Sequence, residues 1–124
     1  MQDTQDSKNS TSRQERIMSH ALVELRRSKW WPLGVHSAVL LDISATGFKI
    51  EFTGKAACRA GDSFWMQIPL TPFAISSPQT ITLKVLVKWF DAEKMRVGGV
   101  FESLDKSSDL YLGQIIERVK EQAL

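Results

Sequence analysis

The alternation of apolar and polar residues between Ile81 and Trp89 constrains the fold of this chain more than any other feature. Successive side chains of a β-strand point to opposite faces, so a period of two indicates a strand with one buried face. The apolar face of this strand carries Ile81, Leu83, Val85, Val87 and Trp89, and the other carries Thr82, Lys84 and Lys88. Because Trp89 ends the inward-facing row, we expect it to pack in the core.

Five further segments have the length and flanking turn residues of short strands. Glycine, proline and aspartate separate the segments, because these residues favour turns. The five segments cover residues 21–27, 37–43, 48–52, 64–70 and 95–101. Regularly spaced short strands of this kind predict a mostly-β fold, a small antiparallel barrel of six strands.

The last segment, from about Ser108, is expected to be an α-helix. Its apolar residues Leu112, Ile116, Val119 and Ala123 recur at helical spacing. Ser107 or Ser108 is the expected N-cap. The apolar stripe predicts a C-terminal α-helix that packs against an opening of the barrel.

The length of 124 residues suits one domain. Residues 1–12 are polar after Met1, so we expect a disordered N-terminal tail followed by a single barrel domain over residues 13–124. The formal net charge of +2 is too small to predict DNA or RNA as a partner. No apolar run approaches membrane-spanning length, so membrane insertion is not expected.

Chemistry-bearing clusters are scarce in the sequence. Cys58 is the single cysteine, which provides no internal disulfide and favours the cytoplasm as the default location. His20 and His36 lack carboxylates at a metal-binding spacing, and Ser44 has no evident histidine base. We therefore expect no catalytic residues, no metal, no cofactor and no enzymatic activity.

The stretch Leu40–Phe52, LLDISATGFKIEF, carries the most distinctive polar cluster. Asp42, Ser44 and Gly47 lie between two predicted strands, where such residues form turns by bonding their own backbone. The same residues would present a carboxylate and a hydroxyl to a ligand. Taken alone, the cluster is more simply a hairpin turn, and both interpretations stay open at this point.

The order of several motifs resembles that of the PilZ domain family, receptors for the bacterial dinucleotide cyclic di-GMP. The motifs are an arginine-containing entry segment, DISATG as the D/N-x-S-x-x-G motif, the Gly61–Asp62 turn, a strand ending in Val87-Lys88-Trp89, the sequence VGGVF and a closing helix. The resemblance extends over about residues 13 to 122. It implies a six-stranded barrel with a C-terminal helix, as the periodicity does independently.

The resemblance also implies a site for cyclic di-GMP made by Arg13, Arg16, Asp42, Ser44 and Gly47. Arginine matches phosphate oxygens and the O6/N7 edge of guanine, and a carboxylate such as Asp42 accepts guanine N–H groups. Gly47 would supply a positive φ and a close backbone approach. The R-x-x-x-R motif of the family is displaced here, because Ser12 stands where the first arginine would precede Arg16.

The leading hypothesis is a stand-alone cyclic di-GMP receptor that relays the second-messenger level to an unidentified protein partner, in the control of motility, pili, biofilm or exopolysaccharide. The alternative, motivated by the displaced arginine, is a PilZ-like module without nucleotide that acts through protein contacts. Trp30 and Trp31, adjacent indoles beside Pro32, are candidate partner contacts. Binding of single-stranded nucleic acid is a distant third hypothesis, because the charge is nearly balanced.

Overall fold

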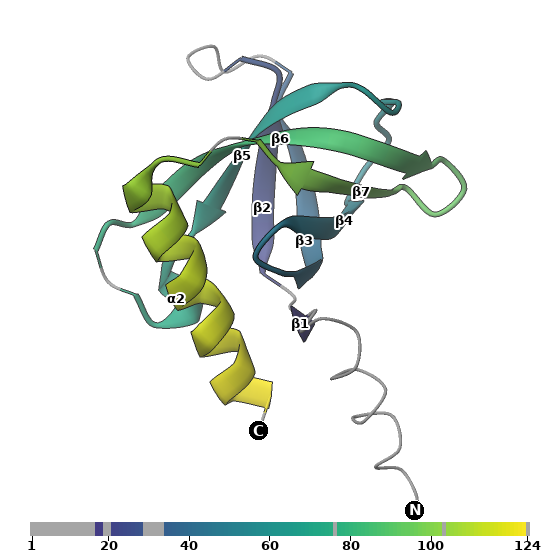
Figure 1. The fold of residues 1–124 in the computed structure, drawn as a ribbon. Coiled ribbons are helices and arrows are strands. Elements are labelled where there is room, and N and C mark those ends of the chain that lie inside the picture. The colour runs from purple at the N-terminus through teal and green to yellow at the C-terminus, as the bar shows by residue number, and fades with distance from the viewer. Residues whose placement is uncertain (1–16, 19–20, 29–33, 76, 103, 124) are drawn as a thin grey trace, which may run out of the picture.

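The computed structural model describes residues 17–18, 21–28, 34–75, 77–102 and 104–123. Its strands form a closed antiparallel barrel of six, with one long helix, α2, packed beside it (Figure 1). Around the barrel the strand order is β3-β2-β5-β6-β7-β4, and the pairing of β4 with β3 closes it. The six-stranded antiparallel barrel with a C-terminal helix predicted from the sequence is confirmed.

The strand bounds agree with the predicted segments to within about two residues. The barrel strands are β2 Leu22–Arg26, β3 His36–Ile43, β4 Gly47–Phe52, β5 Ser63–Pro69, β6 Thr80–Asp91 and β7 Arg96–Phe101. A short 3-10 helix, η1 (Thr71–Phe73), interrupts the connection from β5 to β6, which the sequence predicted to be a plain loop. It buries Phe73 in the core, so this connection contributes to packing as well as to chain reversal.

A two-residue strand, β1 (Ile17–Met18), was not predicted. It pairs with the end of β3, Ile17 opposite Ile43 and Met18 opposite Asp42. The two-residue length explains the failure, since a period of two cannot be recognised in two residues. The chain therefore enters the barrel beside Asp42.

The core is filled by the inward residues of every barrel strand. The largest side chains with almost no exposure are Phe48, Phe64, Phe73, Leu25, Leu40, Ile43, Ile50, Met66, Ile68, Leu70, Leu83 and Leu112. Gly99 of β7 faces this interior opposite Val87, and a Cβ there would lie 2.9 Å from the ring of Phe48. The glycine thus leaves room for an aromatic ring inside a narrow barrel.

Helix α2 (Lys106–Ala123) begins two residues earlier than expected and has a different cap. The carboxylate of Asp105 accepts a hydrogen bond from the N–H of Ser108 at 2.7 Å, so Asp105 takes the position predicted for Ser107 or Ser108. Leu112, Ile115 and Val119 are buried against the barrel. Ile116, which was predicted to share this face, is only partly buried.

Candidate functional site

A β-bulge turns Asp42 to the outside of the barrel. The register of β3 against β4 shifts between Leu40, opposite Ile50, and Asp42, opposite Lys49. Strict alternation would place Asp42 on the inward face with Leu40, and the extra residue reverses that order. Asp42 now shares the outer face with Lys49, while the following residue, Ile43, points into the core opposite Phe48.

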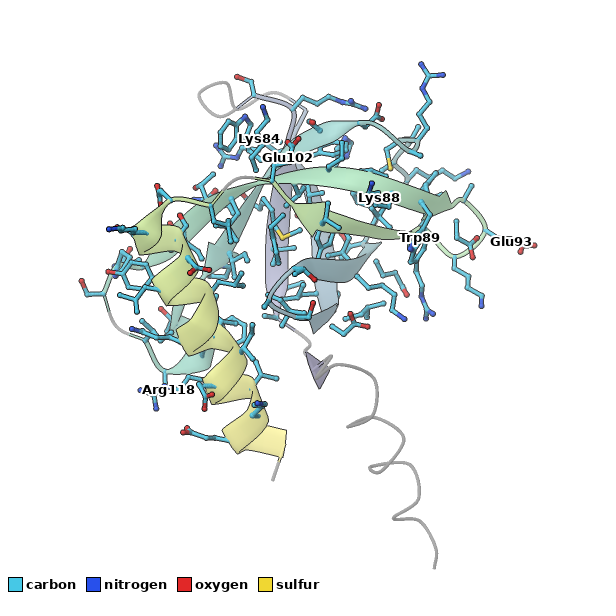
Figure 2. All side chains as sticks on the ribbon, in the orientation of Figure 1. Lys84, Lys88, Trp89, Glu93, Glu102 and Arg118 are labelled. Atoms are coloured by element: carbon cyan, nitrogen blue, oxygen red, sulfur yellow. The ribbon has the colours of Figure 1, made fainter. Side chains whose placement is uncertain are left out.

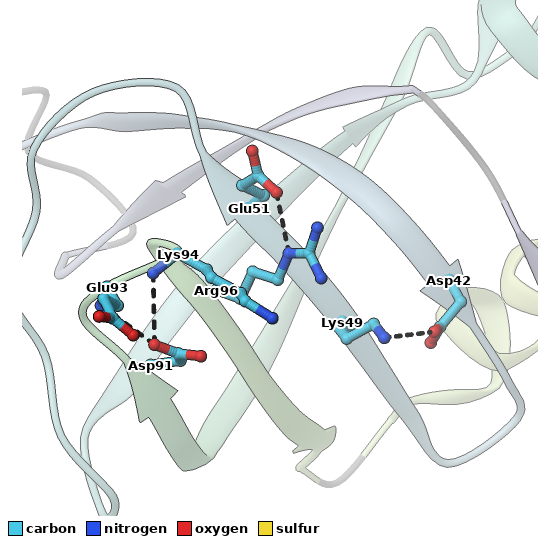
Figure 3. A network of polar contacts seen from close by, with 7 residues as sticks. All are labelled: Asp42, Lys49, Glu51, Asp91, Glu93, Lys94 and Arg96. Carbon is cyan, nitrogen blue, oxygen red and sulfur yellow. Dashed lines mark hydrogen bonds and ion pairs between the residues drawn. The ribbon is translucent and has the colours of Figure 1, made fainter.

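Asp42 and Lys49 form an ion pair across the two strands (Figure 3). The distance from Nζ of Lys49 to Oδ2 of Asp42 is 3.7 Å, which is longer than a charge-assisted hydrogen bond. The side chain of Asp42 is 8% exposed and that of Lys49 is 33% exposed. The carboxylate thus lies in a shallow, largely desolvated position, with a half-exposed ammonium over it.

A second bulge turns Trp89 outward, and the prediction that Trp89 packs in the core is wrong. The register of β6 against β7 shifts between Val87, opposite Gly99, and Trp89, opposite Gly98. As a result Trp89 is 44% exposed and lies on the outer surface near the end of β6 (Figure 2). A Cβ on Gly98 would overlap the indole, so the ring rests directly on the bare backbone of β7.

The two bulges complete a continuous row on the outside of the barrel, here called the outer row. Its members are paired neighbours on four strands: Asp42, Lys49, Gly98 and Trp89. With strands spaced about 4.8 Å apart, three steps extend over roughly 14 Å. The row places an acceptor, a cation and an exposed ring that lies over Gly98 in sequence, a set suited to a ligand with both phosphate and aromatic groups.

The turn after Asp42 is stabilised by Ser44. Its Oγ accepts hydrogen bonds from the backbone N–H of Thr46 at 3.3 Å and of Gly47 at 3.1 Å. The N–H of Ser44 in turn donates to the carbonyl of Gly47 at 2.9 Å. Ser44 therefore stabilises the hairpin turn, as one of the two interpretations of the sequence predicted. Its hydroxyl forms its hydrogen bonds within the turn.

Only glycine fits at position 47, because the backbone of the neighbouring strand β7 lies too close for a side chain. A Cβ at this position would lie 2.6 Å from the carbonyl oxygen of Gly99 on β7. Its φ is outside the positive range that the sequence suggested, since the glycines with positive φ among the described residues are Gly34 and Gly61. The close approach that Gly47 permits in this structure is to the backbone of β7.

A row of charged residues borders the outer row toward the β6–β7 hairpin (Figure 3). Glu51 lies opposite Arg96, and Nε of Arg96 donates to Oε1 of Glu51 at 2.9 Å. Asp91 lies opposite Arg96 and accepts hydrogen bonds from the N–H groups of Glu93 and Lys94, which fixes the hairpin turn. Both the Glu51–Arg96 pair and the Asp91 turn are therefore internal contacts of the chain.

Arg13, Arg16, Trp30 and Trp31 lie outside the described residues. Of the predicted ligand residues, the structure brings together Asp42, Ser44 and Gly47, and the outer row adds Lys49 and Trp89. The sequence contained a signal for part of this addition. Gly98-Gly99 in a strand marks a bulge or a close approach, and here one glycine accommodates the ring of Phe48 inside and the other the ring of Trp89 outside.

The described residues also bear on metal binding, membrane insertion and cysteine reactivity. They contain no group of three His, Cys, Asp or Glu side chains placed to hold a metal ion. No helix in this part of the chain is long and apolar enough to cross a membrane. Partial burial, with a further contribution from Asp62, raises the pKa of the Cys58 thiol, so this cysteine is not an activated nucleophile.

Comparison with protein families gives one match, to the PilZ domain, over residues 10–118. No curated protein sequence matches the chain. The match covers the barrel, the outer row and most of α2.

Solved structures with the same fold include three of low sequence identity, two of which are PilZ domains. The PilZ domain of CeSA from a cellulose-synthesizing bacterium has a TM-score of 0.60 at 14% identity, covering 88% of this chain and 98% of that one. The PilZ domain of YcgR from Escherichia coli, solved with c-di-GMP, has a TM-score of 0.66 at 13% identity, covering 87% and 90%. The Bacillus subtilis inhibitor of motility MotI/DgrA has a TM-score of 0.65 at 15% identity, covering 86% of this chain and half of that one.

Proposed function

Since this chain belongs to the PilZ domain family, we propose that it is a receptor for cyclic di-GMP that relays the second-messenger level to a protein partner. The observation that carries this proposal is the outward, largely desolvated carboxylate of Asp42 within the D-x-S-x-x-G motif. A bulge that turns a charged residue out of a strand next to a ligand motif is a common device of binding sites.

Each group of the ligand has a proposed partner. Asp42 accepts the N–H donors of one guanine, and Arg13 and Arg16 bind phosphate oxygens or the O6/N7 edge of a base. Ser44 and Gly47 act by holding the turn that positions Asp42. The pairing of Met18 with Asp42 supports this assignment, because Arg16 precedes β1 directly in the sequence.

Trp89 is a proposed stacking surface for a guanine. It is exposed, rests on Gly98 and lies in the outer row that begins at Asp42. Stacking of a base on an aromatic side chain contributes about 1–3 kcal/mol. Because the indole covers Gly98, its solvent-exposed face is the flat surface that the outer row offers to a base.

Calorimetric titration with cyclic di-GMP tests the proposal. We expect saturable binding by the full chain and a clear loss of affinity in a version lacking residues 1–16, because the truncation removes Arg13 and Arg16. The proposal would be contradicted if about millimolar cyclic di-GMP gave neither heat nor competition. A dissociation constant of about 1 mM corresponds to a binding free energy of only about −4 kcal/mol. A truncated chain that binds as well as the full chain would exclude the two arginines from the site.

The displaced R-x-x-x-R motif favours a second candidate function, a PilZ module that acts through protein contacts alone. In that case the full chain would not bind cyclic di-GMP, and Ser12→Arg would create or strengthen binding. Trp30→Ala and Trp31→Ala would then abolish capture of the protein partner. Measured nucleotide affinity that falls in Arg16→Ala would decide against this candidate.

The processes served by the receptor are proposed to be those of the family resemblance: motility, pili, biofilm or exopolysaccharide control. The proposed location is the cytoplasm, the default compartment for a chain with one unpaired cysteine. Binding of the ligand would order the segment before β1 over the outer row, and the partner would recognise the changed surface.

A further inference from the structure

Lys49 occupies the position in the outer row from which a cation can serve both Asp42 and a bound phosphate. It is paired across the sheet with Asp42 on one side and with Gly98 on the other. Gly98 has no side chain and the indole of Trp89 lies over it, so on that side Lys49 faces the aromatic ring. A ligand lying along the row would pass directly over Lys49.

The contact between Lys49 and Asp42 is loose enough to be exchanged. At 3.7 Å the ammonium is beyond the 2.7–2.9 Å typical of a charge-assisted hydrogen bond. By contrast, the Nε of Arg96 lies 2.9 Å from Oε1 of Glu51, within hydrogen-bonding distance. A lysine ammonium is a compact charge on a flexible stem, so it can move to a new anion without breaking a fixed, two-pronged contact.

The charge balance of the row changes when a guanine binds. In the free protein the ammonium of Lys49 offsets the desolvated carboxylate of Asp42. The N–H donors of a guanine would take over that carboxylate, and the ammonium would then face a ligand that carries two phosphates. Moving Lys49 onto a phosphate oxygen keeps both anions compensated, whereas leaving it on Asp42 does not.

We propose that Lys49 is the cation of the ligand site that the barrel itself supplies: it neutralises Asp42 in the free protein and moves onto a phosphate when the dinucleotide binds. This inference rests on the proposed function. It also explains how a site with a displaced arginine motif retains a second phosphate-binding cation, because Lys49 is fixed by the pairing of β4 and does not depend on the spacing of Arg13 and Arg16.

The test is calorimetric titration of cyclic di-GMP into the full chain and three variants. Lys49→Ala is expected to weaken binding by about tenfold or more, the usual effect of losing a charged hydrogen bond. Lys49→Arg keeps the charge and should bind the dinucleotide more tightly than Lys49→Ala. Lys55→Ala, at an exposed lysine in the connection after β4, is the matched control and should bind like the parent.

Salt dependence separates a phosphate contact from a purely positioning role. Between about 50 mM and about 300 mM NaCl, screening weakens each exposed ionic contact with the ligand. The affinity of Lys49→Ala should therefore fall less steeply with salt than that of the parent chain. A thermal melt of each free variant shows whether the barrel is intact, so that a folding defect is not read as a binding defect.

The possible results are distinct. If the parent chain does not bind the dinucleotide, the proposed function itself fails. If the parent binds and Lys49→Ala binds equally well, or binds more weakly with unchanged salt dependence, the phosphate contact of Lys49 is wrong while the proposed function stands. Weaker binding together with a shallower salt dependence and rescue by Lys49→Arg supports it.

Discussion

The turn at Ser44–Gly47 and the outer row, which starts at Asp42, are adjacent in the sequence but differ in what their side chains contact. In the turn, the hydroxyl of Ser44 bonds two backbone amides and Gly47 makes room for a carbonyl of β7. In the outer row, a carboxylate and an indole are turned outward by bulges. The comparison divides the D-x-S-x-x-G motif into Asp42, the residue proposed to contact the ligand, and Ser44 and Gly47, which stabilise the turn.

The largest effect is expected for a substitution in the turn, on the free energy of unfolding. Gly47→Ala would place a Cβ 2.6 Å from the carbonyl oxygen of Gly99, and two hydrogen-bonded strands cannot separate cheaply. We expect a loss of about 3 kcal/mol in the free energy of unfolding, at the upper end of overpacking effects, measured by urea denaturation.

The matched control is Gly113→Ala in the exposed face of α2, where an added Cβ meets nothing within 4 Å. That variant should gain up to about 1 kcal/mol, because alanine has the higher helix propensity. A Gly47→Ala protein as stable as the parent would remove the distinction between turn stabilisation and ligand contact at this position.

The next largest effect is on the ligand end of the outer row. Trp89→Ala should weaken cyclic di-GMP binding by about tenfold or more, because base–aromatic stacking contributes about 1–3 kcal/mol. Titration calorimetry measures it, with the unfolding transition as a check on the fold. Trp65→Ala on β5, whose indole lies 5.7 Å from the ammonium of Lys84, is the control and should leave the affinity unchanged. Equal losses in the two variants would mean that Trp89 has no special place in the site.

Ser44→Ala should affect stability more directly than ligand contact. It removes the acceptor for the amides of Thr46 and Gly47, and we expect a loss of about 1 kcal/mol in the free energy of unfolding. Ser44→Asn keeps an acceptor oxygen and should recover part of the loss. A Ser44→Ala protein of unchanged stability that no longer binds the ligand would move Ser44 from the residues that stabilise the turn to the ligand contacts.

The smallest effect, on both stability and affinity, is expected for the ion pair that borders the outer row. Arg96 and Glu51 form a short ion pair, but their side chains are 38% and 42% exposed. Exposed pairs contribute roughly 0–1 kcal/mol, so Arg96→Ala should change the free energy of unfolding by about 0.5 kcal/mol or less. Its affinity for cyclic di-GMP should match that of the parent chain, and a clear loss would extend the site into this second row.

The barrel could be predicted from the sequence because most of its strands follow the simple rule of alternation. The inward positions of β5, Phe64, Met66 and Ile68, are all buried, and the turn at Gly61 has the positive φ that glycine permits. Hydrophobic patterning and turn chemistry act locally, so a single sequence reveals them.

The outward direction of Asp42 and Trp89 could not be predicted in the same way. Each follows a bulge, and a bulge depends on which residue the partner strand places opposite, a non-local fact. The alternation from Ile81 to Val87 is correct, and it reverses only at the last step before Trp89. The cap of α2 was missed for a related reason, since Asp105, Ser107 and Ser108 are all good caps and tertiary context selects among them.

The two-residue strand β1 gives this barrel a point of thermodynamic linkage. Among the described residues, β1 pairs with β3 through Ile17 and Met18 and also contacts α2, and opening so short a segment costs less free energy than global unfolding. Any molecule that binds only the closed form raises this cost by the free energy of its own binding. A ligand beside Asp42 that binds only the form with β1 paired would therefore slow the exchange of the amide hydrogens in β1.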